Sequence, residues 1–202
     1  MPIRLAEPPR AALEALRETL SERAERSDFA TKALRDAPVD ELALTAPHPV
    51  YTLGLDALVG GQGLGGAELT GWRYLVQRGD STIASAEVQV GASGADVSRL
   101  EVNEGPFVRA TEAAVSRAEG LPELEGGTYE LRLLKIPGAY VIALWLKAEG
   151  GGNDVLIPIG ETPPEVEAGR PYEEGELLGA LAEPAHTQLN FDSSPGRQRE
   201  SD

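Results

Sequence analysis

Histidine is the side chain best suited to acid–base chemistry near neutral pH, and this 202-residue sequence holds two, His48 and His186. His48 lies between two prolines on an extended segment. It could act as a general base if the fold set it beside a carboxylate such as Asp56 or Glu87, because proton transfer requires hydrogen-bond contact. An exposed loop histidine is the alternative interpretation of the same position. His186 lies in the polar C-terminal region and joins no recognisable motif.

Other residue types that support catalysis or metal binding form no coherent set. The chain has no cysteine, which excludes disulfides, thiolate metal sites and a cysteine nucleophile. It also lacks the H-E-x-x-H motif, an EF-hand loop and the G-x-S-x-G elbow of a serine nucleophile. Its 33 acidic residues are too abundant for any pair to indicate a site, and Glu104 has a sufficient role in the first turn of a predicted helix. We therefore predict no catalytic residue, no metal site and no cofactor, which favours a protein that is not an enzyme.

Two short motifs match known patterns by letter. Residues 61–66 satisfy G-x-G-x-x-G, but dinucleotide binding needs a long helix directly after the motif, and residues 67–71 lead into a predicted strand instead. Residues 78–80 spell Arg-Gly-Asp, which is also the composition of a hairpin turn. We interpret the first motif as a mobile linker and the second as a turn.

Aromatic side chains on predicted strands are the remaining candidates for a site. Trp145 is interpreted as a core residue, whereas Trp72 fits a core position or a pocket wall equally well. A pocket between the sheet and its helices would be lined by His48, Trp72, Tyr74 and Tyr140.

The segment from Thr128 to Ile159 organises the predicted fold. Tyr140 to Leu146 carries no polar side chain, which is typical of a strand covered on both faces. The arm before it alternates polar and apolar residues, and Pro137-Gly138 supplies a turn. These features predict a hairpin whose second arm is central in the sheet.

Further elements surround that hairpin. An apolar stripe predicts a helix over residues 11–26, which either covers the sheet or seeks a partner chain; we favour covering the sheet. Alternation predicts a hairpin of residues 72–77 and 82–90. Pro106 and Gly120 delimit a helix that should pack on the sheet. Residues 39–49 are expected to be a connector, and Val155–Ile159 an edge strand, because Pro158 cannot donate to a ladder.

The order of these elements predicts an α+β fold. We expect a largely antiparallel sheet of about five strands, with a central helix packed on one face and an N-terminal helix. The predicted organisation is an N-terminal helical segment over 1–38, an α+β domain over 39–182 and a disordered acidic and polar tail over 183–202.

Composition limits the classes of partner. The net charge of −15 would repel phosphate backbones, so nucleic-acid binding is disfavoured. No apolar run is long enough for a membrane span, and no signal peptide is visible at residues 1–10, so a cytoplasmic location is expected.

Two functional hypotheses from different classes remain open. The first is a non-enzymatic protein-binding or assembly module, with self-association through Val155–Ile159 or docking by Leu189 and Phe191 of the tail. The alternative is a small-molecule-binding or hydrolytic α+β domain that uses the pocket named above. The sequence alone does not identify the ligand, the partner or the oligomeric state.

Overall fold

A computed structural model describes residues 3–91, 97–118 and 120–192 of the chain. Within these ranges the α-helices are α1 (Arg10–Glu25), α2 (Lys32–Arg35), α3 (Leu55–Val59), α4 (Pro106–Ala118) and α5 (Glu174–Asp192). The strands are β1 (Ile3–Arg4), β2 (Leu42–Thr52), β3 (Glu68–Arg78), β4 (Ser81–Val90), β5 (Val97–Asn103), β6 (Thr128–Ile136), β7 (Val141–Glu149), β8 (Val155–Pro158) and β9 (Tyr172–Glu173). Four short 3-10 turns, η1 to η4, cover Val39–Glu41, Gly63–Gly66, Pro122–Leu124 and Pro137–Ala139.

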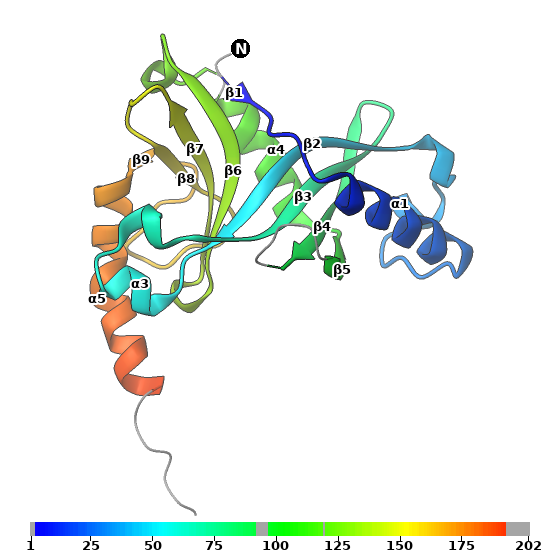
Figure 1. Ribbon diagram of the computed structural model, residues 1–202. Helices are drawn as coiled ribbons and strands as arrows, with labels where there is room; N and C mark the ends of the chain where they lie inside the picture. The colour runs from blue at the N-terminus through cyan, green and yellow to red at the C-terminus, as the bar shows by residue number, and fades with distance from the viewer. Residues whose placement is uncertain (1–2, 92–96, 119, 193–202) are drawn as a thin grey trace, which may run out of the picture.

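All the strands belong to one sheet that divides into two parts (Figure 1). The order is β5-β4-β3-β2-β6-β7-β8-β9, and β1 pairs with β6. Strand β2 pairs with β3 along its whole length, but it pairs with β6 only through Val50, Tyr51 and Thr52. We call β2 to β5 the first half-sheet and β6 to β9 the second half-sheet.

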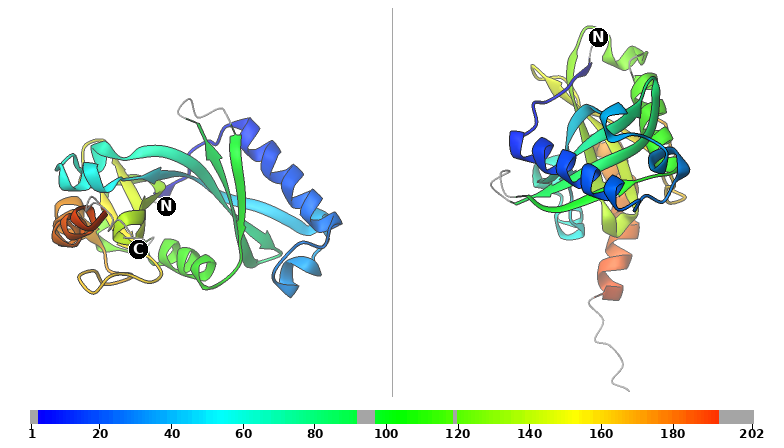
Figure 2. Two further views of the ribbon diagram at one scale, coloured as in Figure 1. Left: turned by 90° about the horizontal axis from the view of Figure 1, so that it is seen from below. Right: turned by 90° about the vertical axis from the view of Figure 1, so that its right-hand side faces the viewer.

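The helices cover these two halves differently. The left view in Figure 2 shows α1 at one end of the molecule, α5 at the other and α4 between them. Helix α4 contacts β4 of the first half-sheet and β7 of the second. It therefore lies across both halves on one face of the sheet.

The predicted sheet of about five largely antiparallel strands is wrong, although the α+β class holds. The described sheet has nine strands, and it is mixed because β6 runs parallel to both β1 and β2. Strands β1 and β9 have two residues each, too few to show a period. The parallel pairs join residues far apart in the chain, such as Val50 and Leu133, and local patterns carry no signal for them.

The connector expected over residues 39–49 is mostly strand β2. Pro47 and Pro49 are tolerated because β2 pairs with β6 only from Val50 onward, so one edge of this part of β2 has no strand partner in the described residues. A register shift between Thr45 and His48, with Ala46 at φ 47°, interrupts the β2–β3 ladder.

Helix α1 packs on the first half-sheet, as the self-packing interpretation predicted. Its Leu16 and Leu20 are buried in one cluster with apolar residues of β3 and β4. The small residues Ala84 and Ala86 of β4 face this cluster and are fully buried. The half-sheet is thus apolar on the face that meets α1.

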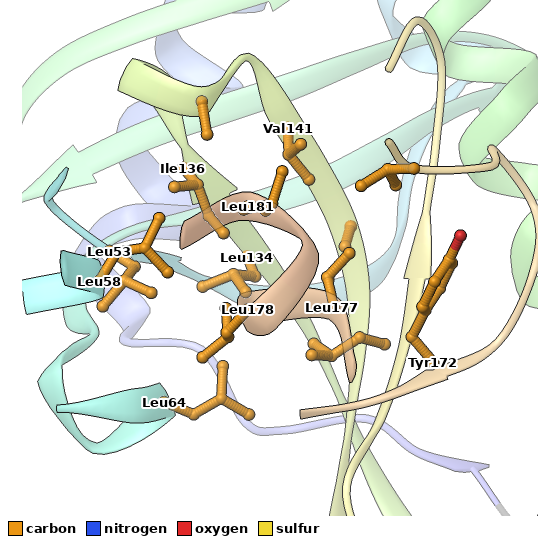
Figure 3. Packing of buried hydrophobic residues seen from close by; sticks show 14 of the residues in the cluster. Leu53, Leu58, Leu64, Leu134, Ile136, Val141, Tyr172, Leu177, Leu178 and Leu181 are labelled. Carbon is orange, nitrogen blue, oxygen red and sulfur yellow. The ribbon is translucent and has the colours of Figure 1, made fainter. Parts of the chain in front are cut away.

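The second half-sheet buries an apolar cluster on each face. On one face, residues of α3 and α5 pack on β6, β7 and β8; Figure 3 shows Leu177, Leu178 and Leu181 of α5 close to Leu134 and Ile136 of β6. On the other face, residues of α4 join those of β6, β7 and β8 in a further cluster, including Ala114, Ala118, Leu131, Leu144 and Leu146. Strand β7 is accordingly central and covered on both sides, as the apolar run predicted.

Tyr140, which we expected within that central strand, lies outside it. It ends the 3-10 turn η4 in the left-handed conformation, with φ 54° and ψ 35°, and β7 begins at Val141. The next strand, β8, ends at Pro158, and its outer edge is covered by β9 and by a hydrogen bond from Gly169 N to the Pro158 carbonyl. The edge proposed for self-association is therefore occupied within the chain.

Helix α5 extends to Asp192, into the region assigned to the tail. Residues 193–202 lie outside the described residues. Within the described ranges, every helix is too short or too polar to cross a lipid bilayer.

Candidate functional site

A row of polar side chains crosses the first half-sheet on the face opposite α1. His48 of β2 is paired in register with Arg73 of β3, Arg73 with Glu87 of β4, and Glu87 with Glu101 of β5. Residues paired directly across neighbouring strands project from the same face of a sheet. Their neighbours along β3, Trp72 and Tyr74, project from the other face into the α1 cluster.

Three charged groups of this region are buried or half-buried together. Arg73 is 2% exposed, and its Nη2 donates a hydrogen bond of 2.7 Å to the Ser85 hydroxyl. Glu87 is 5% exposed and accepts a hydrogen bond from the Lys135 ammonium of β6, so this ion pair joins the two half-sheets. Burial lowers the pKa of the Arg73 guanidinium to about 10, and the Glu87 charge opposes that shift. Buried charges need such pairing, because an unpaired one is strongly destabilising.

His48 is buried beside this group, at 1% exposure, rather than exposed on a loop. Its Nδ1 lies 2.7 Å from the Ala46 carbonyl, which can only accept, so Nδ1 carries the proton. Nε2 then holds a lone pair with no hydrogen-bond partner in the part of the chain that the structure describes. Burial lowers the pKa of the imidazole to about 4; the Ala46 carbonyl opposes this shift and the Arg73 charge adds to it. His48 is therefore neutral at pH 7.

Two pockets open beside these charges. The charged pocket, of about 340 Å³, is lined by residues of β3, β4, β5, α4, β6 and β7: Arg73, Glu87, Glu101, Asn103, Glu104, Gly105, Val108, Lys135 and Ile142. The apolar pocket, of about 690 Å³, is lined mainly by apolar residues of η4, β7 and the segment after β8: Lys135, Pro137, Tyr140, Val141, Ile142, Ile159, Glu161, Thr162 and Pro163.

The two pockets meet at Lys135 and Ile142, which line both of them. We call the combined concavity the groove. It places a mainly apolar lining next to a charged one. Ligand sites of small molecules combine these features: mostly apolar walls, a few polar groups, and volumes of roughly 300–1,000 Å³.

Tyr140 stands at the apolar pocket in a conformation that the fold imposes. A left-handed conformation is unfavourable for residues other than Gly by about 1–2 kcal/mol. The preceding turn fixes it: Ala139 is buried, and a Cβ on Gly138 would lie 2.4 Å from the Leu55 side chain of α3. Tyr140 is nevertheless 78% exposed, and with Leu5 it is one of two exposed large apolar side chains among the described residues.

The four predicted pocket residues do not line one pocket. Tyr140 lines the apolar pocket. His48 adjoins Arg73 in register but lines neither part of the groove, and Trp72 and Tyr74 are buried beneath α1. Burial raises the pKa of the Tyr74 hydroxyl to about 12, and the Arg17 charge opposes this shift.

The two predicted docking residues of the tail fall on α5. Leu189 is half-buried within this helix. The side chain of Phe191 lies outside the described residues.

The two sequence motifs have structural roles. The glycine-rich segment forms η2, where the Leu64 N–H donates a hydrogen bond of 2.7 Å to the Glu174 carboxylate of α5; it is thus tied to a helix rather than being a mobile linker. It leads into β3, and so it lacks the following helix that dinucleotide binding requires. The Arg-Gly-Asp tripeptide forms the β3–β4 turn, with Gly79 at φ 57° and an ion pair of 2.8 Å between Arg78 and Glu41.

The described residues show no group of three or more His, Asp or Glu side chains placed to hold a metal ion. Ser85 is bonded to Arg73, and His48 to a backbone carbonyl, so these groups form no nucleophile–base pair. Comparisons of the chain with protein-family models, curated proteins and solved structures found no match.

Sequence reasoning missed Arg73 and Lys135, although it placed both on strands. Alternation along β3 predicted that Arg73 lies on the face opposite Trp72. The segment that holds Lys135 was predicted as the first arm of a hairpin. The pocket that brings both residues together also includes Val108 of α4, and alternation along a strand does not reveal such a meeting of distant elements.

Proposed function

We propose that this protein binds a small amphipathic molecule in the groove, without performing a reaction on it. The observation that carries this proposal is that an apolar pocket and a charged pocket share Lys135 and Ile142 in their linings. A ligand of mixed character would place its apolar body on Val141, Ile142 and Ile159. Its polar groups would meet the charged lining.

The positions of the charged groups support this interpretation. Lys135 and Glu87 form an ion pair across the half-sheets, and Arg73 is held by Ser85. Such a network is fixed before any ligand arrives, which lowers the entropy lost on binding.

The test is binding of an uncharged fluorescent probe, N-phenyl-1-naphthylamine, whose emission rises in apolar surroundings. We expect saturable binding to the wild-type protein. The variant Ile142→Trp places an indole at the junction of the two pockets and so displaces part of the probe. If the probe loses contacts equivalent to two methylene groups, at about 0.8 kcal/mol each, its affinity falls by about tenfold or more.

The control is Leu5→Trp, which adds the same indole at an exposed residue that lines neither pocket. It should bind the probe as the wild type does. Thermal unfolding of both variants checks that they fold. Equal probe binding by folded Ile142→Trp and Leu5→Trp would remove the groove as the site.

Protein binding, the first hypothesis of the sequence analysis, stays a prediction. The β8 edge is covered within the chain, and residues 183–192 belong to α5. Light scattering at high concentration tests self-association, and a single monomeric species would dismiss that part. Recovery of partners with and without residues 183–202 tests the C-terminal region.

A further inference from the structure

We infer that the ligand of the groove is an organic cation, with one ammonium or amidinium group on an apolar body, and that its positive charge lies between the Tyr140 ring and the Glu161 carboxylate. This inference rests on the proposed function and adds the chemical class of the ligand and its orientation.

The charge of the groove supports a cationic ligand. Its lining holds two cations and four carboxylates, a formal net charge of −2: Arg73, Lys135, Glu87, Glu101, Glu104 and Glu161. The whole chain carries −15, which favours the approach of cations over anions. An anionic ligand would have to overcome both the local and the overall charge.

Neither cation of the groove is available to hold an anionic ligand. The Lys135 ammonium is paired with Glu87, and Arg73 donates to Ser85. Taking Lys135 for a ligand would leave the 5%-exposed Glu87 carboxylate without its ion-pair partner. Such a loss is strongly unfavourable for a buried charge.

The carboxylates differ in how far they are engaged. Glu101 forms an ion pair of 3.0 Å with Arg99, and Glu104 accepts hydrogen bonds from the Ala30 and Thr31 N–H groups. Glu161 is exposed and forms no ion pair or side-chain hydrogen bond with the described residues. A ligand cation can therefore pair with Glu161 without breaking an ion pair or a side-chain hydrogen bond of that carboxylate.

Tyr140 supplies the second part of the cation site. It lines the same pocket as Glu161 and is held in its left-handed conformation by the buried turn before it. An exposed aromatic ring and a carboxylate that line one pocket suit a cation, because the ring face attracts positive charge by about 0.5–2 kcal/mol. The fold itself gains little from this ring, since the side chain is 78% exposed.

The apolar pocket limits the ligand to a cation with an apolar body. Apart from Lys135, Glu161 and Thr162 its lining is apolar or aromatic, so a polycation without an apolar body gains little contact there. A linear polyamine should therefore bind more weakly than a monocation with an apolar body.

The experiment compares three octyl compounds by isothermal titration calorimetry on the full chain: octyltrimethylammonium, octanol and octanoate. Equal chain length keeps the contribution of the alkyl chain constant, so differences in affinity report the headgroup. We expect the cation to bind about tenfold more tightly than the alcohol, from the combined ring and carboxylate contacts. Octanoate should be the weakest of the three. The linear triamine spermidine serves as the polycation and should bind more weakly than octyltrimethylammonium.

Variants locate the charge. Glu161→Gln and Tyr140→Leu should each reduce the preference for the cation over the alcohol by about threefold or more, while octanol binding changes little. Glu165→Gln removes a carboxylate from an exposed residue that lines neither pocket and should leave the preference unchanged.

Each outcome decides one of the two proposals. Equal binding of all three octyl compounds, or tighter binding of octanoate, overturns the cation inference and leaves the groove as a binding site. An unchanged preference in Glu161→Gln overturns the assigned position of the charge, and spermidine binding as tight as that of octyltrimethylammonium overturns the need for an apolar body. No binding of any compound, together with no binding of the naphthylamine probe, overturns the proposed function as well.

Discussion

The two half-sheets bury different kinds of residue on the face that α4 crosses. In the second half-sheet this face is apolar, with Leu131, Leu144 and Leu146 packed against Ala114 and Ala118. In the first half-sheet the corresponding face carries Arg73, Ser85 and Glu87, all nearly or fully buried. The opposite faces of both halves bury apolar clusters. The α4 face of the sheet thus changes from an apolar to a charged lining between the two halves.

This difference separates residues that hold the fold from residues that are available for binding. Burial of apolar surface is the main stabilising contribution on the α4 face of the second half-sheet. The buried charges of the first half-sheet do not stabilise the fold more than apolar residues of similar volume would. Because these charges lie at the groove, we assign them a role in binding. The following predictions test this separation of stabilising and binding residues.

The largest expected effect is the loss of the buried carboxylate. Glu87→Ala leaves Arg73 and Lys135 without their shared counter-charge, so we expect a decrease in the free energy of unfolding of about 4 kcal/mol, measured by urea denaturation. Glu101→Ala, at the next position in register, removes an exposed ion pair and should lose less than about 1 kcal/mol. Similar losses in both variants would contradict the distinction between buried and exposed charges.

An apolar truncation should weaken the second half-sheet by packing alone. Leu144→Ala removes a fully buried side chain and should decrease the free energy of unfolding by about 3 kcal/mol. Octanol binding in the groove should be retained, because Leu144 lines neither pocket. Leu13→Ala, at a half-buried position of α1, is the control and should lose less stability. Loss of binding in folded Leu144→Ala would show that the two roles are not separate.

Acid should destabilise the protein through His48. Its pKa is about 4 in the folded protein and about 6.5 in the unfolded chain. Between these values the unfolded chain binds a proton that the folded protein does not, so stability falls as the pH drops from 6.5 to 4 and this contribution levels off below 4. The full effect is about 3 kcal/mol, at about 1.4 kcal/mol for each pKa unit.

The measurement is urea denaturation of the wild type and of His48→Gln at pH 7 and pH 4.5. The loss of stability between these pH values should be smaller in His48→Gln. His186→Gln, at an exposed position of α5, should behave as the wild type does. An equal loss in all three proteins would mean that His48 titrates normally.

The smallest expected effect concerns the turn before β7. Tyr140→Gly relieves the left-handed strain, by about 1–2 kcal/mol, and adds the greater chain entropy of Gly, about 0.5–1 kcal/mol. The free energy of unfolding should therefore rise by up to about 1.5 kcal/mol or stay constant, while preference for the octyl cation falls. A clear loss of stability would assign Tyr140 a structural role instead.

The sequence predicted those elements in which at least one whole face is apolar. The apolar run from Val141 to Leu146 indicated a central strand because both faces of β7 meet side chains, from α5 and from α4. The α1 stripe and the β3–β4 hairpin were equally visible, since one face of each is apolar. Local periodicity suffices in these cases.

The missed features depend on contacts between distant segments. Alternation along β3 shows that Arg73 and Trp72 lie on opposite faces, but it does not show which face meets water. Tyr140 was placed in the strand by its apolar character, whereas the anchoring of Gly138 against Leu55 fixes it outside. The charged pocket needs five strands and α4 to converge, and no stretch of the sequence carries that information.

The short parallel pairing of β2 with β6 has a consequence for folding kinetics. Val50, Tyr51 and Thr52 join Leu133, Leu134 and Lys135 across a long loop of chain, whereas most pairs within each half connect neighbours in sequence. We expect the pairing of β2 with β6 to form late in folding, because contacts between distant residues are slow to form. The paired residues of β2 and β6 should then show the fastest amide exchange of the central strands. A ligand bound in the groove, in contact with Lys135, would slow that exchange and stabilise the association of the two half-sheets.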